Sequence, residues 1–162
     1  MLAFLVEGKL RSVVDGPGMV TTLSSARWAL ELERAGFPTE VEADMQSYLR
    51  SHVTFYVPTL VAALLVWKRP AGLTWQEASR LAAALQEGLA LVQGLGHSLK
   101  PRPVAVMAAL PTFVLTAATW AFARTRAVKD LGEFGPAEAR ALIDAMAAAA
   151  PGKANKLLAI RP

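Results

Sequence analysis

One stretch of the chain, Asp44 to Trp67 (DMQSYLRSHVTFYVPTLVAALLVW), places the strongest limit on the fold. It begins with mostly polar residues and becomes almost entirely apolar from Val53 onward. A helix of this kind belongs at the centre of a helical bundle, where neighbouring helices cover its apolar part and its polar start faces a cleft. Partial insertion into a membrane is the alternative. Pro58 lacks an amide proton and is expected to kink or break this helix.

The composition favours one mainly helical domain. The chain has 162 residues, which is enough for one domain with its own core. Its hydrophobic share is 54% and its mean hydropathy is +0.34, and alanine and leucine, both good helix formers, supply most of the excess. Cysteine is absent. Disulfides and cysteine-bound zinc are therefore excluded, and the composition fits a cytoplasmic location.

Local start and stop signals predict the other elements. The sequence Thr74-Trp-Gln-Glu77 is a capping box, and Pro111 is expected to start a new helix or to kink one. Expected helices cover residues 24–35, 74–93, 104–123 and 136–150, with one further turn near the C-terminus. Residues 2–6 and 12–14 have the composition of short strands, residues 15–18 (DGPG) that of a turn, and residues 39–42 that of an extended link or a short strand.

These elements predict a helical bundle with a short extended N-terminal arm. Two short strands do not form a stable sheet alone. We therefore interpret residues 1–23 as an arm or as the remnant of a larger β-containing domain, and residues 24–162 as the helical domain.

The charge pattern leaves several partners open. The net charge is +4, which suits an anionic partner such as a nucleotide phosphate, a nucleic acid or lipid headgroups. Basic runs with interleaved aromatics are absent from the sequence, so we do not expect nucleic-acid binding. Two apolar stretches, 53–67 and 104–123, approach the roughly twenty residues that cross a bilayer. The first is short and a proline interrupts the second, so we expect a soluble bundle that buries both.

The polar start of the long stretch carries the candidate site. Ser47, Arg50 and Thr54 are three and four residues apart, on one face of a helix, whereas His52 points to a different surface. The alternative for Arg50 is a solvated surface charge or a partner of a nearby acid, Asp44 or Glu42. The sequence shows no metal-ligand spacing, no nucleotide-binding fingerprint and no serine–histidine–aspartate set. It therefore assigns no residue to a metal or a cofactor, and His97 is expected to be a loop residue.

Residues 32–64 (LERAGFPTEVEADMQSYLRSHVTFYVPTLVAAL) resemble the start of the C-terminal domain of the ketopantoate reductase (2-dehydropantoate 2-reductase) family. In that family a short helix ends in an AGF-like turn, and a short strand then leads to a long helix. The sequence Gln86-Glu87-Gly88, the Gly-His loop and a late segment that starts with proline also fit. The resemblance spans about residues 24–150.

The resemblance implies an all-helical substrate domain that follows an NADP-binding Rossmann domain, in an oxidoreductase of pantothenate biosynthesis. Arg50 stands where the family has a lysine that polarises the substrate carbonyl, and Thr54 and Pro58 stand where it has asparagines. Ser47, Thr54 and Glu138 are the implied substrate-binding residues. Because arginine stays protonated, Arg50 can hold a carbonyl or carboxylate but cannot readily act as a general acid. These departures point to a divergent family member or to a small 2-keto acid other than ketopantoate.

The Rossmann half has no counterpart in the sequence, and residues 1–23 would be what remains of it. The resemblance therefore implies a substrate-binding and dimerisation domain that forms a homodimer and needs a Rossmann-domain partner chain for NADP. As an enzyme, the single chain would be incomplete. A non-enzymatic helical module, either an interaction domain or a membrane-associated one, is the alternative function.

Overall fold

The computed structural model describes residues 3–6, 9–12, 20–67, 69, 71–134 and 136–162. The protein is mainly helical, as the sequence predicts. It consists of two compact units, Met1–Met45 and Gln46–Pro162, which we call the N-terminal unit and the helical unit.

The N-terminal unit contains two pairs of short strands. β1 (Ala3–Val6) pairs antiparallel with β2 (Lys9–Ser12). β3 (Thr21–Leu23) pairs parallel with β4 (Thr39–Val41), and the helix α1 (Ala26–Arg34) connects them. β1 confirms the strand expected at residues 2–6, and β4 confirms the short strand expected at 39–42. The second strand, β2, lies earlier than the one expected at residues 12–14. Residues 13–14 of that expected strand and the turn expected at residues 15–18 lie outside the described residues.

The boundary between the two units lies between residues 45 and 46. The sequence predicts it earlier, between residues 23 and 24. Residues 21–23 bond to residues 39–41, and α1 packs on both strands. The helix expected at residues 24–35 therefore belongs to the N-terminal unit rather than to the helical bundle. The interpretation of residues 1–23 as a remnant of a Rossmann domain stays a prediction.

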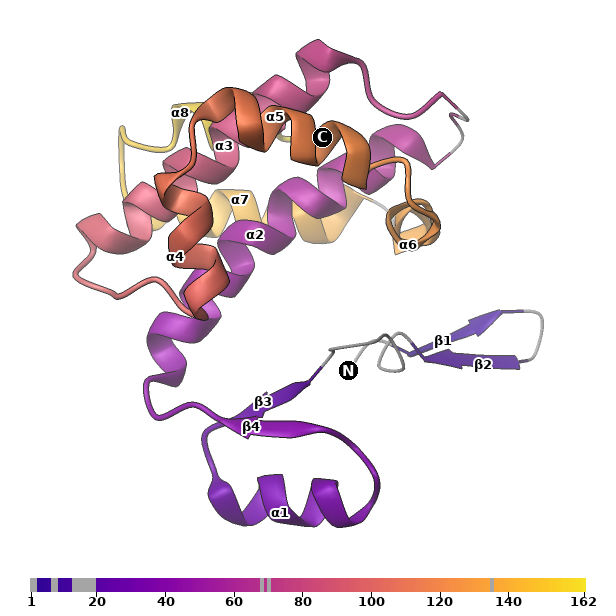
Figure 1. Ribbon diagram of the computed structural model, residues 1–162. Coiled ribbons are helices and arrows are strands. Elements are labelled where there is room, and N and C mark those ends of the chain that lie inside the picture. Colours follow the sequence, from indigo (N-terminus) through magenta and orange to yellow (C-terminus); the bar gives the residue numbers. More distant parts are fainter. Residues whose placement is uncertain (1–2, 7–8, 13–19, 68, 70, 135) are drawn as a thin grey trace. The chain divides into compact units, whose positions relative to one another are not determined.

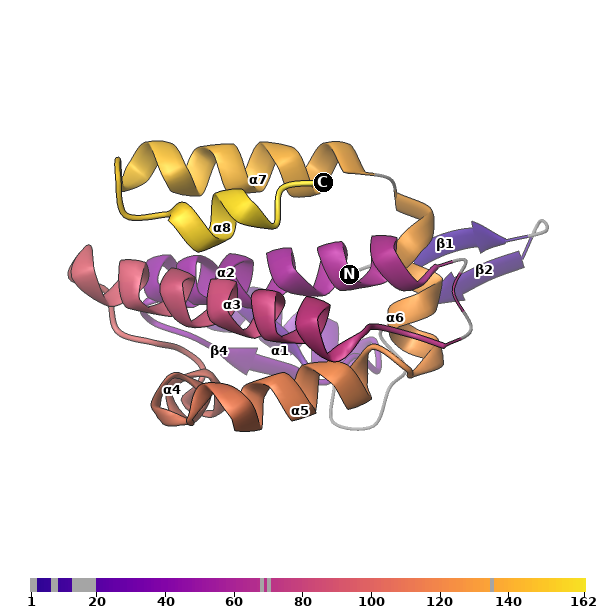
Figure 2. The same cartoon turned by 90° about the horizontal axis from the view of Figure 1, so that it is seen from above.

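The helical unit is built around two long helices, α2 (Met45–Val66) and α3 (Trp75–Gly94). α3 lies along α2, with α7 and α8 on one side of this pair and α4 and α5 on the other (Figures 1 and 2). The remaining elements are α4 (Arg102–Ala109), α5 (Thr112–Phe122), α6 (Arg126–Asp130), the 3-10 helix η1 (Leu131–Phe134), α7 (Pro136–Ala149) and α8 (Asn155–Ala159). α8 confirms the turn expected near the C-terminus.

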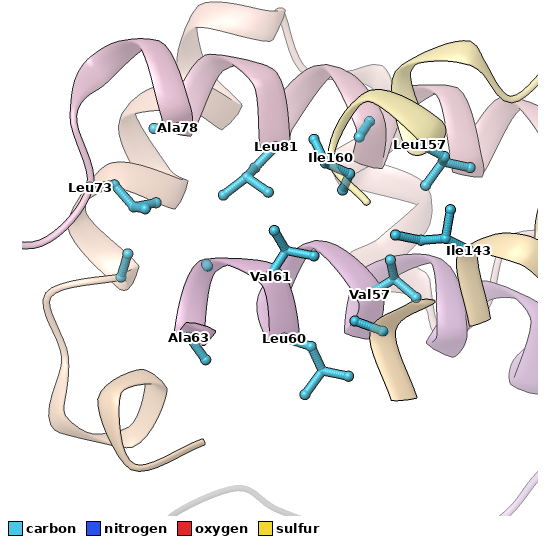
Figure 3. Close-up of a cluster of buried hydrophobic side chains, with 14 of the residues drawn as sticks. Val57, Leu60, Val61, Ala63, Leu73, Ala78, Leu81, Ile143, Leu157 and Ile160 are labelled. Carbon is cyan, nitrogen blue, oxygen red and sulfur yellow. The ribbon is translucent and has the colours of Figure 1, made fainter. Parts of the chain in front are cut away.

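The core forms where α2 meets α3, α7 and α8. Figure 3 shows side chains from these helices pointing toward one another in this cluster. Its largest fully buried members include Val57, Leu60, Leu81, Ile143 and Leu157. The long apolar stretch is therefore a central bundle helix, as predicted.

Two prolines in the apolar stretches have different effects on helical structure. Pro58 lies inside α2, which stays helical from Met45 to Val66, so of the two expected effects, a kink or a break, the break is wrong. Its ring is buried, so packing around the helix offsets the lost hydrogen bond. Pro111 does separate two helices, α4 and α5. Residues 104–123 are therefore not one long span, and the expectation that the bundle buries this stretch is wrong, because α5 buries only Leu115 and Thr116.

Among the described residues, one helix, α2, is long and apolar enough to cross a bilayer. Half of its most apolar stretch is buried inside the protein. A core helix of a bundle meets the same criteria of length and composition, so α2 fits both a bundle helix and a membrane span.

The capping box at the start of α3 is present. Thr74 Oγ1 accepts a hydrogen bond from the Glu77 amide (3.2 Å), and Glu77 accepts one from the Thr74 amide (2.8 Å). Arg69 adds two donors to the same carboxylate, at 2.8 and 2.9 Å. The hydrogen bonds from Arg69 lower the pKa of Glu77 to about 2.

We expect Glu77→Ala to reduce the free energy of unfolding by about 2 kcal/mol at neutral pH, because it removes a cap and an ion pair. The pKa of Glu77 is lower in the folded state than its ordinary value of 4.5. The stabilisation is therefore present above about pH 4.5 and is lost as the pH falls toward about 2. Urea unfolding of both proteins across this range measures the effect. Asp144→Ala, which removes an exposed pair with Arg161, is the matched control with a smaller expected loss.

Candidate functional site

A pocket of about 230 Å³ lies between α2, α3 and α7. Its walls are apolar except at Arg50 and Thr54, both on α2. The exposed residues Arg50, Leu95 and Ala149 mark its mouth, and buried Thr54 and Gly88 mark its floor. The other lining residues are Val53, Leu91, Val92, Leu142, Ala145 and Met146.

Arg50 brings a positive charge to the mouth of this apolar pocket. Its side chain is exposed. No hydrogen bond or ion pair joins its guanidinium to another residue in the described part of the helical unit. A guanidinium has five N–H donors in a fixed fork, which suits two hydrogen bonds to a carboxylate. Arg50 is therefore placed to hold the carboxylate of a ligand whose apolar part enters the pocket.

Thr54 forms part of the pocket floor. It is fully buried, and its Oγ1 donates a hydrogen bond to the backbone carbonyl of Arg50 at 2.9 Å. The hydroxyl proton is thus used within α2, so it is not available to a ligand carbonyl in this arrangement. Its methyl group faces α3 at Gly88, where an added Cβ would lie 2.5 Å from Thr54 Cγ2. Glycine at position 88 allows the two helices to approach here.

Ser47 and Ser51 connect α2 to the segment that follows α3. Ser47 Oγ lies 3.3 Å from His97 Nδ1, and Ser51 Oγ accepts a hydrogen bond from the Lys100 amide at 3.1 Å. Both serines are buried. Ser47 is therefore turned toward this segment and is not among the residues that line the pocket.

Glu138 begins a different cluster at the start of α7. Burial, followed by the negative charge of the Glu138 carboxylate, raises the pKa of Tyr56 on α2 above its ordinary value. His52 stacks between Tyr56 and Tyr48, with ring centroids 6.0 Å apart in both pairs. His52 thus lies on a different face of α2 from Arg50, as the spacing predicts. Glu138 does not line the Arg50 pocket.

The structure therefore brings together two of the four candidate site residues, Arg50 and Thr54. The apolar walls were not predicted as part of a site. Leu91, Leu142 and Met146 follow the same helical spacing as core residues, and only the positions of α3 and α7 beside α2 show that they surround a pocket. Gly88 is the one residue whose type indicated a contact here, because a glycine inside a long helix often marks the close approach of another helix.

Comparisons with protein-family models, with curated proteins and with solved structures find no match for this chain. The interpretation of the pocket therefore depends on its own geometry and on the resemblance noted in residues 32–64.

Proposed function

We propose that the helical unit is the substrate-binding domain of an NADP-dependent oxidoreductase of the ketopantoate reductase type, acting on a small 2-keto acid. The observation that carries the proposal is the position of Arg50 at the mouth of an apolar pocket, with Thr54 from the same helix on its floor. Both residues occupy positions that the resemblance assigns to the substrate site.

The size of the pocket favours a small ligand. Pockets for drug-sized molecules have volumes of about 300–1,000 Å³, and this one has about 230 Å³. Its walls include leucine, valine and methionine side chains, which suit a short branched hydrocarbon group. A branched 2-keto acid has such a group next to a carboxylate. It therefore matches both the walls and the charge at the mouth.

The residues of this pocket do not fit a dinucleotide. The pocket is too small for one, and its walls offer one cation and no glycine-rich phosphate loop. The proposal therefore places NADP on a Rossmann-domain partner chain and assigns no residue of this chain to the cofactor.

Arg50 has a positioning and electrostatic role in this proposal. Its guanidinium holds the carboxylate and brings positive charge near the carbonyl oxygen, where negative charge develops during reduction. It does not supply the proton that the product oxygen needs, because arginine stays protonated at all relevant pH values. A group outside the pocket must therefore protonate the product oxygen. Thr54 shapes the floor of the pocket with its methyl group. Because Ser47 and Glu138 do not line this pocket, the proposal gives them no contact with the ligand there.

We expect the chain to bind 3-methyl-2-oxobutanoate more tightly than 3-methyl-2-butanone, which has the same branched group but no carboxylate. Arg50→Gln should weaken binding of the acid about tenfold or more, the usual effect of losing a charge-assisted hydrogen-bonded pair. It should leave binding of the ketone unchanged. Isothermal titration calorimetry at low ionic strength measures both ligands.

Two control variants make this test specific. Arg80→Gln removes an exposed arginine of α3 that does not line the pocket, so it should not alter binding. Arg50→Lys keeps the charge but loses the paired N–H donors of the guanidinium. Its affinity for the keto acid should therefore lie between those of the wild type and Arg50→Gln. Equal affinity of the wild type for the acid and the ketone would contradict the proposal. So would equal losses of affinity for the acid in Arg50→Gln and Arg80→Gln.

The proposed enzyme would be a cytoplasmic homodimer that also binds its Rossmann-domain chain. NADPH oxidation with a 2-keto acid should then require both chains. Turnover by this chain alone would contradict the placement of the cofactor on a partner.

A further inference from the structure

Two neighbouring helices of the helical unit expose apolar faces to solvent. On α5, the residues Phe113, Ala117 and Trp120 follow one another at a spacing of four and three and are all exposed. Phe113 has an exposed fraction of 69%. On α4, Val106 has an exposed fraction of 55%. Large aromatic and aliphatic side chains gathered on a surface usually mark a contact with a protein or a membrane.

The composition of α5 makes this exposure unusual. The helix has no charged residue, and it buries Leu115 and Thr116 against the bundle. A helix that is apolar on all sides is normally covered on all sides. The face that carries Phe113 and Trp120 therefore lacks a covering layer in the described structure of the helical unit.

The segment that contains α4 and α5 carries only positive charges. Residues 88–129 contain no aspartate or glutamate. Arg102 is exposed at the start of α4, on the same helical face as Val106. Arg124 follows α5, and its guanidinium lies over the ring of Trp120, with Cζ 3.4 Å from the ring centroid. Arg124 is held there by donating hydrogen bonds to the carbonyls of Trp120 and Leu73. The other basic residues of this segment are Lys100, Arg126 and Lys129.

We propose that the exposed faces of α4 and α5 bind the surface of an anionic lipid bilayer. Phe113 and Trp120 would enter the boundary between headgroups and acyl chains, and the basic residues would contact anionic headgroups. Tryptophan and arginine side by side suit this boundary, since one is amphipathic and the other is cationic.

Two other arrangements fit this surface less well. A symmetric contact between two copies would bring Arg102 and Arg124 of one copy near the same residues of the other, and like charges repel each other. α5 cannot span a bilayer, because its 11 residues extend only about 16 Å. A helix lying in the plane of the membrane surface needs no such length.

Co-sedimentation of the full chain with vesicles tests the proposal. The chain should bind vesicles of phosphatidylcholine with about one third phosphatidylserine, and should bind pure phosphatidylcholine vesicles at least about fivefold more weakly. Phe113→Ser and Arg102→Glu should each lower binding to the anionic vesicles about fivefold or more. Leu158→Ser and Lys153→Glu alter an exposed leucine and an exposed lysine near α8 and should bind like the wild type.

Several results would overturn the proposal. One is no binding to anionic vesicles, and another is equal binding to neutral ones. If Phe113→Ser abolishes self-association in light scattering but leaves vesicle binding intact, the surface belongs to a second copy. If the chain resists alkaline carbonate extraction from the vesicles, it inserts as an integral protein and does not lie on the surface.

Discussion

Gly132→Ala is expected to lower the free energy of unfolding of the helical unit by about 3 kcal/mol, the upper part of the range for overpacking a buried site. Gly132 lies in η1 against the end of α2. A Cβ added there would lie 2.4 Å from Trp67 Cβ and 2.8 Å from the carbonyl oxygen of Ala63. Both atoms belong to or adjoin the backbone, so neither can move away as a flexible side-chain tip can. The added methyl group must therefore push η1 and α2 apart.

Urea unfolding followed by circular dichroism measures this loss. Gly94→Ala is the matched control, because Gly94 ends α3 and a Cβ there would meet no atom within 4 Å. It should leave stability unchanged or raise it by up to about 1 kcal/mol, as alanine is the better helix former. If both variants are as stable as the wild type, η1 does not pack against α2 as described.

Gly88→Ala is expected to cost about 2 kcal/mol, and Thr54→Ser should restore most of that loss. The reason is the closest contact, since the new Cβ would lie 2.5 Å from Thr54 Cγ2. Serine at position 54 lacks this methyl group and keeps the hydroxyl that bonds to Arg50. The double variant should therefore have nearly the stability of Thr54→Ser alone.

A double-mutant cycle measures this coupling, which we expect to be about 1–2 kcal/mol. Because both residues form the pocket floor, Gly88→Ala should also weaken binding of the branched keto acid. Additive losses of stability would contradict the contact between α2 and α3 at this point. A large coupling in stability without any change in keto-acid binding would show that the floor of the pocket does not meet the ligand.

The parts of the fold that local signals determine could be predicted from the sequence. The capping box at Thr74 and Glu77 forms within one turn, so its residues suffice to predict it. Pro111 separates α4 from α5 for an equally local reason. Pro58 shows the limit of such rules. The same residue type does not break α2, because burial on several sides holds that helix together.

The parts that depend on distant contacts could not be predicted in this way. The pairing of β3 with β4 makes α1 part of the N-terminal unit, and no residue of α1 indicates this pairing. Likewise, the polar start of α2 indicated a cleft, but Ser47 and Ser51 turn toward the segment that contains His97 and Lys100. The spacing of residues on one helix shows which of them share a face, but it does not show which neighbour that face meets.

The most direct test of the proposed site is methyl NMR of the chain during titration with 3-methyl-2-oxobutanoate. The proposal predicts the largest shifts at Leu91, Leu142 and Met146, which line the Arg50 pocket. It predicts no shifts at Met107 and Leu115, which line a separate apolar pocket of about 250 Å³. Shifts confined to Met107 and Leu115, or no saturable shift at any methyl group, would contradict it.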